Sequence, residues 1–225
     1  MPAVAVPAWT VREVAPRAAT SGAPPLLVLL HGIGADEHDL LPLAAEVDPR
    51  FHVVSVRAPQ PYGPGFAWFD IQWLPDGRVQ PDVAQAHAAL ADLIAWIGAA
   101  PTRFGTDPRR TYLLGFSQGA MLSVGVLRAA PARLAGVAAL SGRSPDGLFE
   151  QTADEADVAR VPLLVAHGTW DDVLPVANGR RLRELFAPVL RDFAYREFPV
   201  AHGIVPEEMA WVATWLAAHL DAPAP

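Results

Sequence analysis

Gly115-Phe116-Ser117-Gln118-Gly119 is the stretch of the chain that decides the fold. The residues before it, 111–114, form an apolar run typical of a β-strand, and residues 120–124 after it continue as a helix former. A strand, a Gly-x-Ser-x-Gly turn and a helix in succession indicate a nucleophile elbow. The flanking glycines let the chain turn sharply, and the helix N-terminus favours negative charge that develops beside the serine. We therefore predict that Ser117 is a nucleophile at the end of a strand.

Strand-like and helix-like stretches alternate through the rest of the chain. Apolar runs typical of strands buried on both faces occupy residues 26–30, 51–56, 134–140 and 162–166, with further strands expected at 11–14 and 193–198. Helices are expected at 39–46, from Asp82 with Gln85 in the capping-box position, at 176–186, and from Pro206 onward. Residues 58–77 and 144–160 are predicted to be loops. The pattern predicts one α/β domain over residues 1–225, a mostly parallel sheet flanked by helices without a large lid domain.

Composition excludes several functions. The net charge of −7 argues against a nucleic-acid partner. The chain has no cysteine and no lysine, which excludes disulfides, thiolate chemistry, cysteine-based zinc sites and lysine Schiff bases. We see no apolar stretch approaching the ~20 residues of a membrane span and no basic region of a signal peptide, so we expect a cytoplasmic location without stable membrane insertion. We predict no metal and no cofactor, and a monomer or homodimer.

The base that activates Ser117 is found by elimination. In an elbow of this kind the chain order is serine, acid, histidine. His202 lies in a loop after the last predicted strand and fits that order. His167 ends a strand but is followed by Asp171, which would leave the base without a downstream position, and His219 lies in the last turn of the closing helix. We therefore predict that His202 is the base.

The acid should follow a strand between the serine and the histidine, because sites in a parallel sheet form beyond the C-terminal ends of its strands. Asp171 and Asp172 come just after the run at 162–166 and are the well-placed candidates. Asp192 precedes a strand, and the remaining aspartates of this region lie in a polar loop. Spacing alone leaves both Asp171 and Asp172 open.

Two backbone amides should stabilise the oxyanion of a tetrahedral intermediate. One is expected from Gln118, the residue after the nucleophile. The other is expected from the loop after the strand at 26–30, where His31-Gly32-Ile33-Gly34 places an amide between two glycines. We predict the Ile33 and Gln118 amides as the oxyanion hole.

With these residues in view, the chain resembles the phospholipase/carboxylesterase family of α/β-hydrolases, which includes acyl-protein thioesterases and small bacterial carboxylesterases. The matching pieces are residues 30–34, 36–41, 68–70, 115–119, 167–175 and 202–204. The resemblance implies an α/β-hydrolase fold, a triad of Ser117, His202 and Asp171 rather than Asp172, and an oxyanion hole at Ile33 and Gln118. Ala35 departs from the thioesterase pattern, in which Gly-Asp is usually continuous, and resembles the bacterial esterase branch.

The activity that these residues predict is hydrolysis of small-molecule carboxylic esters with short to medium acyl chains, through an acyl-enzyme on Ser117. Lysophospholipase or acyl thioesterase activity on the same triad is the alternative, and a catalytically inactive binding module is a third. Trp68 and Phe69, in the aromatic segment 58–77, are candidate substrate contacts. The competing interpretation of that segment is a loop packed on its own side chains.

Overall fold

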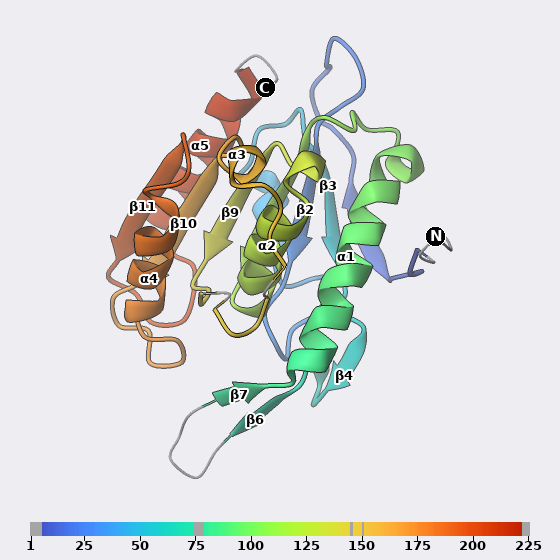
Figure 1. Ribbon diagram of the computed structural model, residues 1–225. Helices are drawn as coiled ribbons and strands as arrows, with labels where there is room; N and C mark the ends of the chain where they lie inside the picture. Colours follow the sequence, from blue (N-terminus) through green and yellow to red (C-terminus); the bar gives the residue numbers. More distant parts are fainter. Residues whose placement is uncertain (1–5, 74–78, 145, 150, 222–225) are drawn as a thin grey trace.

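A seven-stranded sheet runs through the computed structural model, which describes residues 6–73, 79–144, 146–149 and 151–221 (Figure 1). The strand order is β1-β3-β2-β8-β9-β10-β11. The bounds are β1 Val11–Val14, β2 Leu26–Leu30, β3 His52–Val56, β8 Thr111–Phe116, β9 Gly136–Leu140, β10 Leu163–Gly168 and β11 Phe193–Phe198. Strand β1 is antiparallel to β3, and the other neighbouring pairs are parallel. The predicted mostly parallel sheet is therefore confirmed.

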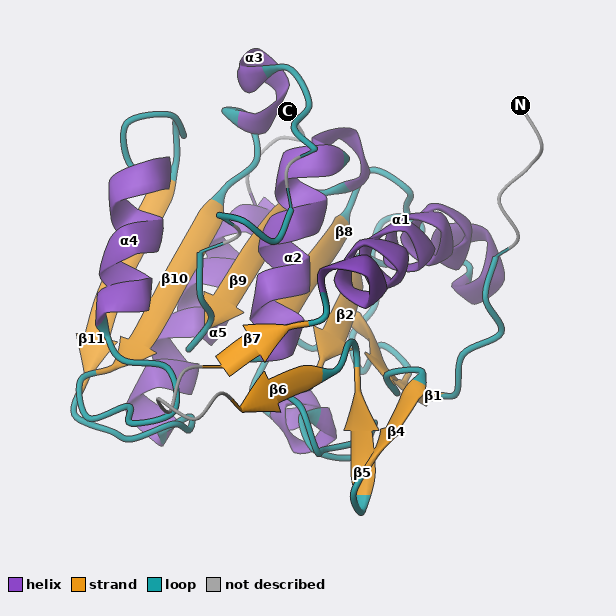
Figure 2. Cartoon of the chain, turned by 60° about the horizontal axis from the view of Figure 1, so that its bottom comes forward, coloured by secondary structure: helices purple, strands orange, loops and turns teal. Residues whose placement is uncertain are grey.

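Helices cover both faces of this sheet (Figures 1 and 2). Three of them lie on one face: α1 Val83–Phe104, α2 Gln118–Ala129 and α4 Ala177–Phe186. The closing helix, α5 Pro206–Asp221, lies on the other face and begins at the proline, as predicted. Short helical turns occupy Leu41–Ala45, Pro131–Arg133 and α3 Glu155–Val158. The sheet is a central layer between two helical layers, which is the α/β-hydrolase arrangement.

Strand β2 shows how the sequence produces two cores. All five of its residues have fully buried side chains. Leu26, Val28 and Leu30 join the core beneath α1 and α2, whereas Leu27 and Leu29 join the core beneath α5. Successive side chains of a strand point to opposite faces, so a continuous apolar run is what a strand covered on both faces requires.

Several elements differ from the sequence-based expectation. The helix expected at 39–46 is a 3₁₀ turn with a proline in its first turn. The segment 58–77, expected to be a loop, contains the ribbon β4 Gln60–Tyr62 and β5 Gly65–Ala67, and strand β6 Ile71–Trp73, which pairs with β7 Val79–Pro81. Residues 74–77 of that segment lie outside the described residues, as do 145 and 150 of the segment 144–160, which includes α3. Figure 2 shows both ribbons at the edge where the parallel strands end.

The start of α1 corrects the predicted capping box. Asp82 Oδ1 accepts a hydrogen bond from the Gln85 amide at 3.0 Å, as an N-cap should. The Gln85 side chain does not return to Asp82, however. It accepts from the Asp70 amide at 2.9 Å and donates to the Asp70 carboxylate at 3.0 Å. The glutamine therefore ties the segment after the β4–β5 ribbon to the helix.

Helix α1 also corrects the statement that no stretch approaches a membrane span. It has 22 residues and a window of mean hydropathy 1.3, so length and composition alone would allow it to cross a membrane. In the structure it packs beside α2 and buries one face, which includes Leu90, Leu93, Trp96 and Ile97. Its apolar residues serve the core of this fold.

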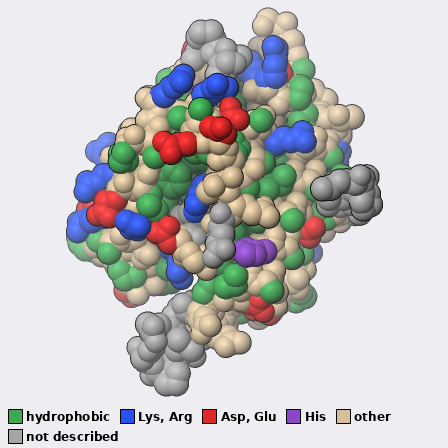
Figure 3. Space-filling view, in the orientation of Figure 1, with side chains coloured by type: hydrophobic (Ala, Val, Ile, Leu, Met, Phe, Trp, Pro, Cys, Tyr) green, Lys and Arg blue, Asp and Glu red, His purple; other side chains and the backbone are tan. Residues whose placement is uncertain are grey.

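Charged side chains of both signs are intermixed on the face that carries α1, α2 and α4 (Figure 3). Around α4, Arg180 pairs with Glu197 at 2.8 Å and Arg181 with Asp146 at 3.1 Å. The partly exposed Glu197 carboxylate accepts hydrogen bonds from Arg180, which lower its pKa to about 2. In each pair the two opposite charges therefore neutralise one another on this face.

Candidate active site

The turn between β8 and α2 holds Ser117 in a conformation that a non-glycine residue rarely adopts. Its φ is 53° and its ψ is −114°. The two flanking glycines are required by close packing, because a Cβ on Gly115 would overlap the Gly119 carbonyl and one on Gly119 would overlap the Leu30 carbonyl. The strained turn therefore depends on glycine at both positions and presents the serine beyond the end of β8.

Three side chains from separate segments meet at this turn. Ser117 Oγ lies 3.0 Å from His202 Nε2, and His202 Nδ1 lies 2.7 Å from Asp171 Oδ2. Ser117 comes from the elbow, Asp171 from the loop after β10, and His202 from the loop between β11 and α5. The structure thus brings together the three residues that the sequence analysis selected, in one continuous chain of hydrogen bonds.

The loop after β10 fixes the carboxylate that faces His202. Asp171 Oδ1 accepts hydrogen bonds from the amides of Val173 at 3.1 Å and Leu174 at 2.7 Å. Its other oxygen, Oδ2, receives the imidazole. Asp171 is only 6% exposed, whereas the Asp172 side chain is exposed and takes no part in these contacts. Backbone amides and the imidazole together compensate the burial of the Asp171 carboxylate.

His167 lies behind Asp171 and was missed as a contributor to the site. Its Nε2 donates to the Leu174 carbonyl at 2.7 Å and lies 3.4 Å from Asp171 Oδ2. The ring is fully buried, and burial lowers its pKa, so the neutral form is favoured. The sequence placed His167 at the end of a strand, but which loop carbonyl it contacts depends on the path of residues 171–174.

The loop after β2 approaches the elbow from the other side. A Cβ on Gly32 would lie 3.2 Å from the Ser117 Cβ. Gly34 has a φ of 81°, and its amide donates to the Phe66 carbonyl at 2.8 Å. Ala35, the residue that departs from the thioesterase pattern, forms a β-bridge with Phe66. The loop that contains Ile33 is therefore fastened to the β4–β5 ribbon.

The Gln118 side chain has a second role that the sequence analysis did not foresee. Its Nε2 donates to the Phe69 carbonyl at 2.8 Å, and its Oε1 accepts from the Trp68 amide at 3.0 Å. The oxygen and the nitrogen of this buried side-chain amide are thus both paired with one backbone segment. The residue after the nucleophile thereby holds the aromatic segment against the elbow.

Trp68 and Phe69, the candidate substrate contacts, are each 1% exposed. Both belong to the core beneath α1 and α2, and the Trp68 indole packs edge-on against Trp9 at 5.5 Å. Trp68 Nε1 donates to the His31 carbonyl at 2.9 Å. For these two residues the structure favours the packed-loop interpretation over a pocket wall.

Asp36, Glu37 and His38 form a cluster whose ligand atoms lie within 4.8 Å of one another. The chemistry of this cluster does not suit a cation. Both oxygens of the buried Glu37 carboxylate accept from Arg57, at 2.6 and 2.8 Å, so a guanidinium already supplies the positive charge. These hydrogen bonds hold the pKa of Glu37 below its usual value.

The geometry and the fold agree with comparisons to known proteins. The family model described as phospholipase/carboxylesterase matches residues 14–220. The chain belongs to the phospholipase/carboxylesterase family of α/β-hydrolases.

Among curated relatives, acyl-protein thioesterase 1 of Candida albicans is 27% identical over 216 residues, which are 87% of this chain and 92% of that protein. A probable carboxylesterase of Oryza sativa is 27% identical over 165 residues, which are 69% of this chain but only 59% of that protein. Among solved structures, the Bacillus cereus carboxylesterase superposes with a TM-score of 0.81 at 24% identity, covering 94% of this chain and 95% of that one. The similarity to the Bacillus cereus structure supports the α/β-hydrolase fold of this chain.

Proposed function

We propose that this chain is a serine hydrolase that cleaves carboxylic esters through an acyl-enzyme on Ser117. The observation that carries the proposal is the 3.0 Å contact between Ser117 Oγ and His202 Nε2 at a strained strand-to-helix turn. A serine hydroxyl is a weak nucleophile, and a hydrogen-bonded base is what activates it. Membership in the family supports the same reaction class.

In the first step His202 acts as general base. Its Nδ1–H donates to Asp171 Oδ2 at 2.7 Å, so the neutral ring presents an unprotonated Nε2 to Ser117. As Ser117 Oγ attacks the ester carbonyl carbon, its proton passes to that nitrogen. The Asp171 carboxylate then stabilises the imidazolium and keeps the ring in place.

The carbonyl oxygen becomes an oxyanion when the new C–O bond forms. The amides of Ile33 and Gln118 are the donors in this proposal, and in the described residues neither donates to another protein atom. On collapse of the intermediate, His202 gives its proton to the departing alcohol. Water then attacks the acyl-enzyme, His202 takes a proton from that water and returns one to Ser117 Oγ, and the carboxylic acid leaves.

The substrate class in this proposal is small esters with short to medium acyl chains. Within the part of the chain that the structure describes, no large lid covers the elbow. Each methylene buried in an apolar cleft contributes about 0.8 kcal/mol, and methylenes that remain in water contribute nothing. We expect kcat/KM to rise over short p-nitrophenyl esters and then level or fall at medium length. An optimum at palmitate would overturn this substrate range.

A second candidate is thioester hydrolysis by the same triad, favoured by the similarity to acyl-protein thioesterase 1 of Candida albicans. Matched oxygen esters and thioesters with identical acyl groups distinguish the two. If the ester proposal is correct, kcat/KM for the oxygen ester should exceed kcat/KM for the matched thioester by more than the difference in their uncatalysed hydrolysis rates. A preference for the thioester would support the second candidate.

Labelling with a fluorophosphonate probe tests the proposal against a binding module. The probe reacts with a serine that a base activates, so we expect one modified residue, Ser117, identified by mass spectrometry of the digested protein. Heat-denatured protein is the control, because it retains the serine but loses its contact with His202. If the folded protein fails to react with the probe, the hydrolase proposal is wrong and a binding module is favoured.

A further inference from the structure

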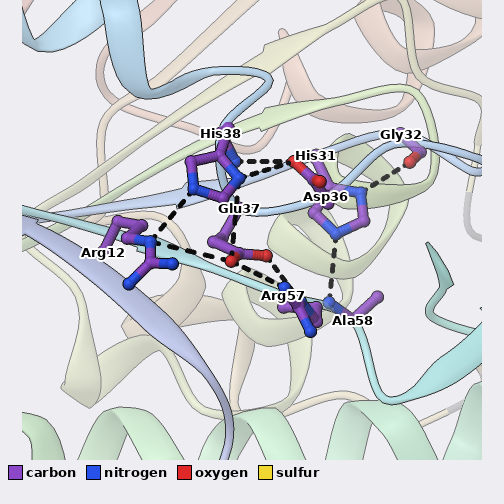
Figure 4. A network of polar contacts seen from close by, with 8 residues as sticks. All are labelled: Arg12, His31, Gly32, Asp36, Glu37, His38, Arg57 and Ala58. Carbon is purple, nitrogen blue, oxygen red and sulfur yellow. Dashed lines mark hydrogen bonds and ion pairs between the residues drawn. The ribbon is translucent and has the colours of Figure 1, made fainter. Parts of the chain in front are cut away.

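Both ring nitrogens of His31 and its backbone carbonyl oxygen have hydrogen-bond partners, and Figure 4 shows the two ring contacts. Its ring Nδ1 lies 2.7 Å from the Gly32 carbonyl oxygen, and its Nε2 lies 3.0 Å from the Ala58 amide. Its own carbonyl accepts from Trp68 Nε1 at 2.9 Å. The side chain is fully buried. Such a residue is fixed from three directions.

The two ring contacts determine the tautomer. The Ala58 amide can only donate, so Nε2 must be the unprotonated acceptor. Nδ1 then carries the hydrogen and donates it to the Gly32 carbonyl. Burial lowers the pKa of His31, which favours this neutral form over a charged ring that could not accept from Ala58.

The Gly32 carbonyl and the Ile33 amide belong to one peptide unit. A trans peptide is planar, and its C=O and N–H point to opposite sides. A hydrogen bond that holds the Gly32 oxygen toward His31 therefore turns the Ile33 hydrogen away from His31. Glycine at position 32 has no side chain to restrict rotation of this unit, so an external partner is needed to select one orientation.

This peptide lies against the nucleophile. A Cβ on Gly32 would lie 3.2 Å from both the Ser117 Cβ and the Phe116 Cδ1. Gly32 is thus packed against the elbow, so the peptide that follows it lies close to Ser117. In the described residues the Ile33 amide, turned away from His31, donates to no other protein atom.

We propose that His31 is a positioning residue, whose Nδ1–H holds the Gly32 carbonyl and thereby directs the Ile33 amide at the oxyanion formed on Ser117. This inference rests on the proposed function, because it assigns a cause to the orientation of one oxyanion donor. His31 itself does not touch the reacting atoms.

The other end of the imidazole is braced by an ion pair. Arg57 precedes Ala58 and makes two hydrogen bonds to Glu37, which follows the oxyanion loop (Figure 4). The Arg57 amide donates to the Thr10 carbonyl at 3.0 Å. The loops after β2 and β3 are thus joined twice, once through His31 and once through Glu37. The Ala58 amide that donates to the ring is therefore held by residues that lie outside the reaction centre.

Two substitutions separate the functions of the two ring nitrogens. In His31→Asn the side-chain amide can take the place of Nδ1 and still donate to Gly32, but it cannot reach Ala58. In His31→Gln the longer amide takes the place of Nε2 and can accept from Ala58, while the donor to Gly32 is lost. His52→Gln, at the opposite end of the neighbouring strand, is the matched control.

We expect His31→Gln to lower kcat by about 10²-fold with little change in KM, because an oxyanion donor acts in the transition state and is worth ~10²–10³-fold. His31→Asn should keep kcat within about threefold while its melting temperature falls, because a buried Ala58 amide loses its acceptor. Activity and stability then rank in opposite orders. Equal losses of kcat in both variants, or retention of kcat by His31→Gln, would overturn the proposal.

The native protein offers a measurement that does not depend on either variant folding. Nitrogen-15 chemical shifts of the imidazoles distinguish a neutral ring with hydrogen on Nδ1 from the other tautomer and from the charged ring. We expect the first form for His31 at neutral pH, and either of the others overturns the proposal. Failure of the proposed function would show instead as a native chain that does not react with fluorophosphonate.

Discussion

The same dipeptide, histidine followed by glycine, ends two parallel strands on opposite sides of Ser117. His31-Gly32 follows β2, and His167-Gly168 ends β10. Both imidazoles are fully buried, and burial lowers the pKa of both. Both glycines permit close packing, Gly32 against the elbow and Gly168 against the carbonyls of the loop that leads to His202. The two turns thus share a position in the fold and a neutral buried ring.

The rings differ in the nitrogen that they use. His31 donates from Nδ1 to its neighbouring carbonyl and accepts at Nε2, so both nitrogens are paired. His167 donates from Nε2 to Leu174, and its Nδ1 has no hydrogen-bond partner in the described residues. The first ring orients a backbone amide, and the second supports the loop that holds the Asp171 carboxylate. One sequence signal can therefore produce two structural roles, decided by the loop that follows it.

The largest expected effect tests whether both turns serve one nucleophile. Ser117→Ala should lower kcat by about 10⁴- to 10⁶-fold, because the members of a triad act as a unit. The fold should remain, since alanine fits the same elbow. Steady-state kinetics with p-nitrophenyl butyrate and a circular dichroism spectrum measure both. Near-normal turnover by the folded variant would show that Ser117 is not the nucleophile, and the two turns would then not serve a common residue.

The second effect concerns the turn after β10. Asp171→Asn should lower kcat by roughly 10³-fold or more, because an amide that donates toward His202 Nδ1 favours the wrong tautomer. Asp172→Asn is the matched control, since that side chain is exposed, and it should cost far less. Measured kcat/KM values in the reverse order would show that the acid has been misassigned.

The sequence predicted which three side chains meet at the elbow better than it predicted the contacts that support them. Ser117 and His202 follow from strand–turn order and residue chemistry, Asp171 was selected over Asp172 by the family resemblance, and the structure joins the three by hydrogen bonds. Burial on both faces was likewise readable from the apolar run at 26–30. These features depend on local pattern and on the order of elements.

The supports depend on contacts between distant segments. The Gln118 side chain holds the backbone of Trp68 and Phe69. No local sequence pattern predicts a contact between segments so far apart in the chain. The aromatic character of the segment left a pocket wall and a packed loop both open, and tertiary packing buries the Trp68 and Phe69 rings. The short strands β4 to β7 were missed because each is only three residues long, and β4, β5 and β7 contain a proline or a glycine, which weakens the strand signal.

A third effect concerns a buried carboxyl that follows the His202 loop. Glu208 is fully buried, and neither of its oxygens has a hydrogen-bond partner in the described residues. Burial raises its pKa to about 7 from the usual 4.5, against a weaker opposing effect of the Val205 backbone. The unfolded chain therefore releases this proton first as the pH rises. Stability is lost from about pH 4.5 upward, and the loss is complete above about pH 7.

Glu208→Gln removes this ionisation while keeping the size of the side chain. We expect the variant to be more stable than the native chain above pH 7, by at most ~3 kcal/mol, and the difference to vanish near pH 4. Urea unfolding at pH 4, 6 and 8 measures it. A difference that is independent of pH would show that Glu208 is not the titrating group. The expected pH dependence would show that Glu208, like His167, is a buried group with polar atoms that lack hydrogen-bond partners in the described residues.

The smallest effect is a mirror image of the test at His31. At His167 the donor is Nε2, so glutamine should replace it and asparagine should not. We expect His167→Gln to keep kcat within about twofold. His167→Asn should lose about 1–3 kcal/mol of stability, because the buried Leu174 carbonyl loses its donor, and about tenfold in kcat as the Asp171 loop loosens. Kinetics and urea unfolding of the two variants, set beside those of His31→Asn and His31→Gln, give opposite rankings of kcat at the two turns if each ring acts through the nitrogen that the structure assigns. The same ranking at both turns would mean that the two imidazoles do the same job and that the loops do not distinguish them.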